Sequence, residues 1–175
     1  MASFHQRLIG AACLRSATYE DVEHDASATR QAAIVVAIAS FTSSVAWYFG
    51  TADAWLIVSG ATRALIGWLA GAAVLWVIGT RLLPGRDTEA DLGQLLRTVG
   101  FAQTPGLFGV LAVVPVVGLF VPFMVAMWVI AATVVAVRQA LDYDSTFRAV
   151  LVCLLGLIVS VIVVYVTGFG ATVVH

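Results

Sequence analysis

The chain has 175 residues, of which 61% are hydrophobic and only 11% are charged, and its net charge is −1 at pH 7. Ordinary soluble domains carry about twice that charged fraction, so this composition excludes a soluble globular domain and favours a protein that exposes apolar surface to lipid. The near-neutral charge, with no basic patch that interleaves aromatic residues, excludes nucleic acid as a partner.

Residues 1–30 are predicted to form a cytoplasmic N-terminal segment with a short amphipathic helix. Phe4, Leu8 and Ala12 follow each other at intervals of four, which places them on one helical face. An acidic cluster between Glu20 and Asp25 is interpreted as a solvated segment, with a bound cation as the alternative.

Five apolar runs follow, and a helix needs about 20 such residues to cross the hydrocarbon core. The predicted spans are residues 31–50, 55–81, 103–118, 121–141 and 146–168. The predicted fold is therefore all-α: a polytopic transmembrane five-helix bundle formed by residues 31–175, with cytoplasmic interfacial amphipathic helices.

A second interfacial helix is predicted between the second and third spans. Thr88 and Asp91 have the spacing of a capping box. An apolar stripe follows at helical spacing, which favours a helix lying on the inner leaflet. The stripe consists of Leu92, Leu95, Leu96 and Val99.

The stretch RTVGFAQTPG, residues 97–106, is predicted to form the interfacial corner where this helix turns steeply into the third span. Gly100 permits a bend, and Pro105 disfavours helix before it while starting the next helix well. We expect Gln103 to satisfy free backbone groups and Arg97 to reach lipid phosphates. A binding site at this corner is the alternative. Pro115 should distort the outer end of the third span.

The arginines predict the orientation, because cytoplasmic loops of membrane proteins are enriched in basic residues. Eight arginines fall on one side of the five predicted spans and none on the other; they are Arg7, Arg15, Arg30, Arg81, Arg86, Arg97, Arg138 and Arg148. This distribution predicts a protein of the inner, cytoplasmic membrane with a cytoplasmic N-terminus and an external C-terminus.

The sequence offers little for catalysis or cofactor binding. The three histidines lie outside the predicted spans, and no Ser-His-Asp set or metal motif is present, so we expect no enzyme activity, cofactor or metal site. Arg63 is the single charged residue well inside a span. It is interpreted as an anchor that snorkels to the outer headgroups or to Asp53, with a substrate or ion site as the alternative.

Small residues recur at helical spacing in two spans. Gly60, Gly67 and Gly71 share a face of the second span, and Gly156 and Ser160 repeat the spacing in the fifth. Such faces let helices approach closely in lipid. We expect them to pack within the bundle, with docking to another membrane protein as the alternative.

The order of these features resembles the Yip family of membrane proteins. The resemblance rests on Gly100, Phe101 and Pro105 after an amphipathic segment, on the turn PVVGLFVP, and on the segment VAVRQALDYDSTFRAV before the last span. It implies a five-span, non-enzymatic integral membrane protein whose partners are the lipid bilayer and other integral membrane proteins. Such a protein would organise, assemble or stabilise membrane components, for example as an accessory subunit of a larger membrane complex. The alternative is a small transporter or channel that uses Arg63 and the proline-broken third span.

Overall fold

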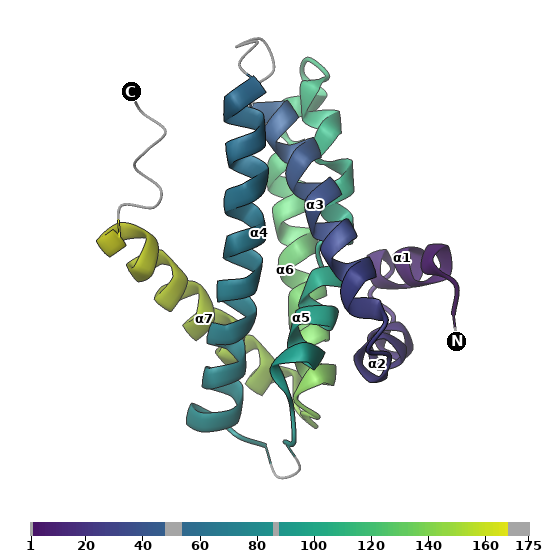
Figure 1. The fold of residues 1–175 in the computed structure, drawn as a ribbon, viewed down its shortest axis with the longest axis vertical. Coiled ribbons are helices and arrows are strands. Elements are labelled where there is room, and N and C mark those ends of the chain that lie inside the picture. The colour runs from purple at the N-terminus through teal and green to yellow at the C-terminus, as the bar shows by residue number, and fades with distance from the viewer. Residues whose placement is uncertain (1, 48–53, 86–87, 168–175) are drawn as a thin grey trace.

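The computed structural model describes residues 2–47, 54–85 and 88–167, which are helical with no strand (Figure 1). The α-helices are α1 Phe4–Ala12, α2 Ser16–His24, α3 Ala28–Trp47, α4 Ala54–Val77, α5 Leu92–Phe101, α6 Val121–Ala140 and α7 Thr146–Thr167. A π-helical turn, η1 Ile78–Leu82, extends α4, and two 3₁₀ helices, η2 Thr104–Val113 and η3 Val117–Leu119, lie between α5 and α6.

Four helices of the described residues are long and apolar enough to cross a bilayer. They are Ala28–Ala46, Ala54–Leu82, Val121–Ala140 and Thr146–Val163. They match the first, second, fourth and fifth predicted spans within a few residues. An apolar run of about 20 residues indicates a membrane-spanning helix, so these four could be recognised from the sequence. The all-α polytopic class is confirmed, whereas the count of five spans is not.

The third predicted span differs from the expected α-helix. Its helical part is the ten-residue 3₁₀ helix η2, about 20 Å long at the usual 3₁₀ rise. Pro105 lies in the first turn of η2, as predicted. Pro115 lies beyond the end of η2, in the turn that leads to η3, so it follows the helix rather than bending its outer end.

The prediction that residues 88–99 form a surface helix on the inner leaflet is wrong. Helix α5 packs against α2, α3, α4 and α6, and Leu95 and Val99 of the apolar stripe are buried in protein. The cap also differs, since the α5 capping box joins Asp91 to Gln94, while the Thr88 hydroxyl donates to the Leu141 carbonyl. An apolar stripe has the same spacing whether it faces lipid or protein, so periodicity alone could not separate the two cases.

Indole groups of α4 fasten the α5 region to the bundle. The Nε1 of Trp68 donates to the Leu96 carbonyl at 3.2 Å, and that of Trp76 donates to the Ala90 carbonyl at 2.9 Å. The Trp76 bond supplies a partner for a carbonyl that lies outside the helices, in an apolar setting.

The α5–η2 segment follows α3 instead of turning steeply at the corner. A Cβ built on Gly100 would lie 2.7 Å from the Ala32 Cβ, and one on Gly106 would lie 3.0 Å from the Ala39 Cβ. A Cβ built on Gly109 would likewise lie 3.0 Å from the Ser43 Oγ. These partners advance along α3 in chain order, over roughly 16 Å of helix. The hydrogen bonding changes from the α to the 3₁₀ type near Gln103, and the path continues beside α3.

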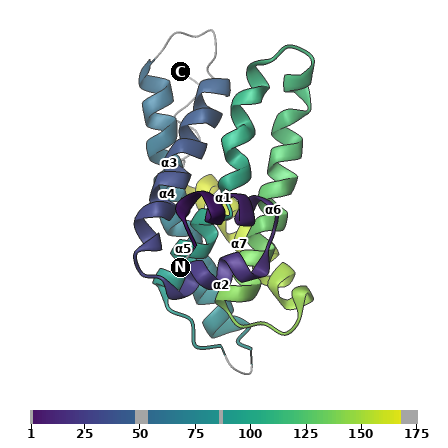
Figure 2. The same ribbon diagram turned by 90° about the vertical axis from the view of Figure 1, so that its right-hand side faces the viewer.

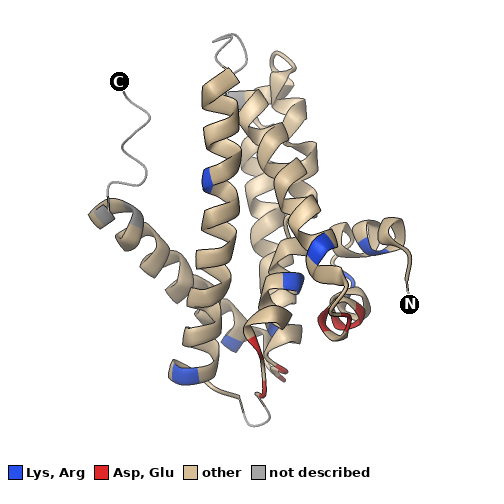
Figure 3. Cartoon of the chain, viewed as in Figure 1, with Lys and Arg blue, Asp and Glu red and all other residues tan. Residues whose placement is uncertain are grey.

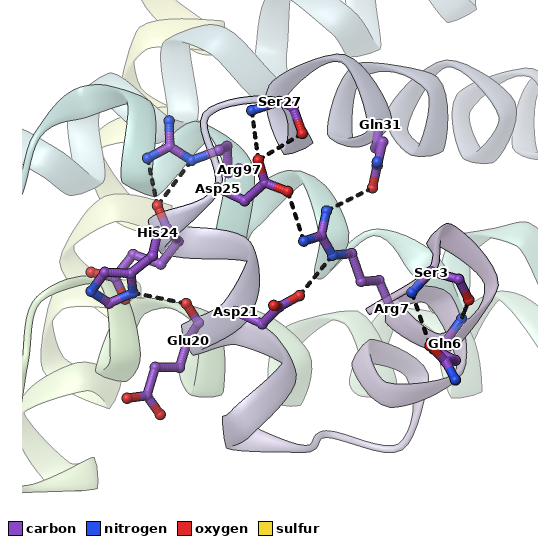
Figure 4. A network of polar contacts seen from close by, with 11 residues as sticks. Ser3, Gln6, Arg7, Glu20, Asp21, His24, Asp25, Ser27, Gln31 and Arg97 are labelled. Atoms are coloured by element: carbon purple, nitrogen blue, oxygen red, sulfur yellow. Dashed lines mark hydrogen bonds and ion pairs between the residues drawn. The ribbon is translucent and has the colours of Figure 1, made fainter. Parts of the chain in front are cut away.

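The N-terminal segment is fastened to the bundle by a buried arginine (Figure 4). Arg7 of α1 is 1% exposed; its Nε donates to Asp21 at 2.8 Å and its Nη2 to Asp25 at 2.7 Å. The third nitrogen, Nη1, donates to the Gln31 amide oxygen at 3.1 Å, which reaches α3. One guanidinium therefore joins α1, α2 and α3. The boundary at residue 30 between two domains stays a prediction.

Helix α7 diverges from the other long helices. Figures 1 and 2 show it leaving the end of the bundle near α2 and running obliquely away from α3 and α6. Its contacts are made with α6, with α4 and with η1. Only 17% of its Thr146–Val163 span is buried inside the chain, so most of α7 presents apolar surface outward.

The charged residues gather at one end of the molecule, called here the basic end. Figure 3 shows basic and acidic positions around α1, α2 and the adjoining ends of the long helices, with a basic position farther along α4. The single basic residue of α4 is Arg63. Arg86, the loop at residues 48–53 and the tail after residue 167 lie outside the described residues, so the full arginine count is not tested.

Candidate functional site

A cavity of about 730 Å³ lies between the α3–α4 pair and the pair formed by η2 and α6. Figure 2 shows these two pairs side by side, toward the end of the bundle remote from α2. The polar lining residues are Ser40, Ser43, Ser44, Arg63 and Gln103. Small residues make up much of the remaining wall: Ala39, Ala46, Gly60, Ala64, Gly106, Gly109, Ala112 and Ala126.

Arg63 forms the charged part of the cavity wall. Its side chain is half-buried, and its Nη2 lies 3.5 Å from the hydroxyl of Ser59, one turn toward the N-terminus of α4. Side chains of an α-helix lean toward the helix N-terminus, so this direction is the one that a snorkelling arginine takes. Asp53, the expected neighbour, lies outside the described residues.

The residues of the expected interfacial corner serve different parts of the bundle. Arg97 is 9% exposed and donates to the Glu23 carbonyl from Nε at 3.1 Å and from Nη2 at 2.6 Å. It therefore ties α5 to α2 inside the protein instead of reaching lipid phosphates. Phe101 is fully buried and meets Phe4 edge-on, whereas Gln103 lines the cavity.

The predicted small-residue faces divide into packed and open positions. A Cβ on Gly156 would lie 2.7 Å from Leu75 of α4, so this glycine packs inside the bundle, and the Ser160 hydroxyl donates to its carbonyl. Gly67 and Gly71 have nothing within 4 Å of an added Cβ. The expectation that these two pack within the bundle is wrong, because an added Cβ at either position meets open space.

Comparison with protein families decides the classification. The model of the Yip1 domain matches residues 15–167, which is nearly the whole chain. The chain belongs to the Yip1 domain family. No curated protein and no solved structure gives a significant match.

The cytoplasmic acidic cluster predicted in this Yip1-domain protein contains one buried carboxyl group. Glu23 is 4% exposed, and burial raises the pKa of its carboxyl to about 7, with a further upward contribution from Asp142. His24, on the same helix, is exposed, and its Nδ1 donates a hydrogen bond to the Glu20 carbonyl at 2.9 Å. Within residues 2–47, 54–85 and 88–167, no three His, Cys, Asp or Glu side chains are grouped as metal ligands.

Replacing Glu23 with Gln should stabilise the protein above pH 7 and have little effect near pH 4. The folded carboxyl keeps its proton to a higher pH than the unfolded one, whose pKa is near 4.5, so stability falls as pH rises from about 4.5 to about 7. A gain of about 1–2 kcal/mol at pH 8 is expected. Unfolding midpoints measured at both pH values test this. Glu20→Gln, an exposed neighbour, is the control, and equal pH dependence of Glu23→Gln and the parent would contradict the account.

Two features of the Yip1-domain chain were not predicted from the sequence. The burial of Arg7 depends on acids 14 and 18 residues away, which no local pattern marks. The packed glycines Gly106 and Gly109 were also missed. Their spacing to Gly100 does not fit one α-helix, because the helix type changes between them.

Proposed function

We propose that this Yip1-domain protein is a non-enzymatic polytopic membrane protein that organises, assembles or stabilises other integral membrane proteins. Its residence in the inner membrane with a cytoplasmic N-terminus belongs to the same proposal and is supported by the arginines at the basic end. The bilayer and other membrane proteins are the expected partners, and a small-molecule substrate is not.

The open face at Gly67 and Gly71 carries this proposal. Two glycines four residues apart let another helix approach the α4 backbone, and van der Waals contact drives helix association in lipid. No neighbouring helix of the described chain uses this face. Only 17% of the α4 span is buried inside the chain, so the helix has ample surface for a partner.

A second candidate function, a small transporter or channel, is supported by the cavity that Arg63 lines. A charged group at depth in a bundle is a common feature of substrate and ion paths. The two functions differ in which part of α4 they use, since the cavity contains Gly60 and Arg63, whereas Gly67 and Gly71 lie farther along the helix and outside the cavity.

Gly67→Leu should leave the fold intact and remove partner contact. The new side chain meets open space within the chain, so the free energy of unfolding in detergent should stay within about 0.5 kcal/mol of that of the parent. Co-purification with membrane partners in mild detergent should fall at least several-fold, because a leucine keeps the partner helix from approaching the backbone.

Ala131→Leu is the matched control, because Ala131 is an exposed position of α6 that receives the same side chain. It should co-purify the same partners as the parent. If Gly67→Leu and the parent recover identical partners, the α4 face is not the docking surface and the proposal fails.

A further inference from the structure

We propose that two copies of this chain form a symmetric dimer by exchanging α7. In this dimer the second half of α7, residues 157–167, packs on the α4 face at Gly67 and Gly71 of the other copy. The inference rests on the proposed function, because it names a second copy as the membrane protein that this face binds.

The contact between α4 and α7 inside one chain ends near Gly156. Helix α7 contacts η1, at the end of α4, and a Cβ built on Gly156 would lie 2.7 Å from Leu75, so the two helices run antiparallel. From Leu157 to Ile162 every residue except Ser160 is exposed. Figure 1 shows α7 running obliquely away from the other long helices. The second half of α7 therefore leaves its own α4 with apolar surface uncovered.

The open face of α4 continues the contact that α7 leaves. Gly71 and Gly67 lie four and eight residues before Leu75, so the three positions follow one another along one side of α4. An antiparallel helix seated on Leu75 through Gly156 would bring Ser160 beside Gly71, one turn farther on. Small residues on both helices allow this close approach in lipid. Within one chain that place is open, because an added Cβ at either α4 glycine meets nothing within 4 Å.

One chain carries both sides of this contact, which favours a second copy as the partner. A two-fold dimer needs a self-complementary surface, in which each copy supplies both partners of every contact. Rotation about an axis along the membrane normal preserves helix direction, so the partner's α7 meets α4 in the same antiparallel sense as the chain's own α7. Exchange of an identical element between copies is a low-cost route to a dimer.

Disulfide crosslinking between two differently tagged copies of the full chain tests the exchange. Cys13→Ser and Cys153→Ala first remove the native cysteines from both copies. One copy then receives Gly71→Cys and the other receives Ser160→Cys, and the two are expressed together and oxidised in intact membranes. The expected product is a heterodimer that carries both tags.

Three variants show whether the product depends on the α4 face. Leu69→Cys in place of Gly71→Cys should give no heterodimer, because Leu69 is exposed on the opposite side of α4. Gly67→Leu, added to the copy with Gly71→Cys, should lower the yield about tenfold or more, because overpacking keeps the helices apart. Ala131→Leu in α6 should leave the yield unchanged.

Three results would overturn the dimer. The first is the absence of a product with both tags. The second is a crosslink that forms only inside a single chain carrying both Gly71→Cys and Ser160→Cys, which would show that α7 closes on its own α4. The third is an equal heterodimer yield with and without Gly67→Leu.

The proposed function can be tested apart from the dimer. If Gly67→Leu loses other integral membrane proteins during co-purification while no product with both tags forms, the α4 face binds a different protein, and the dimer alone is excluded. If the heterodimer forms but Gly67→Leu co-purifies the same other membrane proteins as the parent, the face serves the dimer alone, and docking of other proteins through it is excluded.

Discussion

Arg7→Met should lower the free energy of unfolding by about 2–3 kcal/mol, measured by thermal or denaturant unfolding in detergent. The substitution leaves Asp21 and Asp25 facing an apolar side chain, with side chains only 31% and 11% exposed. Breaking a fully buried ion pair costs about 3–5 kcal/mol and an exposed one at most about 1 kcal/mol, so this half-buried network lies between the two. The N-terminal helices should loosen from α3, because Arg7 also donates to Gln31.

The Arg7 prediction has a matched control and a rescue. Arg15→Met removes an exposed arginine of the same segment and should change stability by less than about 0.5 kcal/mol. Adding Asp21→Asn and Asp25→Asn to Arg7→Met should recover part of the loss, because the uncompensated charges are then gone. If Arg7→Met and Arg15→Met unfold at the same midpoint, the buried network does not hold the N-terminal helices.

Gly100→Leu should cost about 3 kcal/mol, at the upper end of the usual penalty for overpacking. Even a Cβ at this position lies 2.7 Å from the Ala32 Cβ and 3.2 Å from the Trp68 ring, and the remaining leucine atoms need more space. Separation of α5 from α3 would relieve the contact and open the core. Unfolding in detergent, monitored by tryptophan fluorescence because Trp68 is at the contact, measures the effect.

Gly67→Leu is the matched comparison, since the same substitution there meets nothing within 4 Å. The smaller change Gly100→Ala should be relieved by Ala32→Gly, which removes the opposing methyl group. Equal midpoints for Gly100→Leu and Gly67→Leu would show that α5 does not pack on α3 as described.

The long helices could be predicted from the sequence because about 20 apolar residues in a row have one common explanation. Helix α5 shows where this reasoning ends. Its existence follows from an apolar stripe, but its place in the core depends on Arg97, whose partner is a backbone carbonyl 74 residues away. From the sequence, such an arginine is expected at the surface. Only the folded chain supplies the carbonyl that makes its burial possible.

The candidate sites show a similar limit. Arg63 could be found from the sequence because it is a charged residue inside an apolar run. The cavity beside it depends on glycines of η2 that meet small residues of α3, and two separate segments must be placed in register before this contact appears. The face at Gly67 and Gly71 was found from its spacing. Spacing does not say which helix uses such a face, since packing within a chain and docking to a partner require the same small residues.

The most direct measurement of partner docking through α4 is photo-crosslinking in intact membranes. A photoreactive amino acid is placed at Gly71 and, as the control, at Leu69, which is exposed on the opposite side of the same helix. The account predicts a discrete adduct with another integral membrane protein from position 71, absent from position 69 and lost in the Gly67→Leu background. Adducts of the same yield and mass from both positions, or lipid adducts alone from position 71, would contradict it.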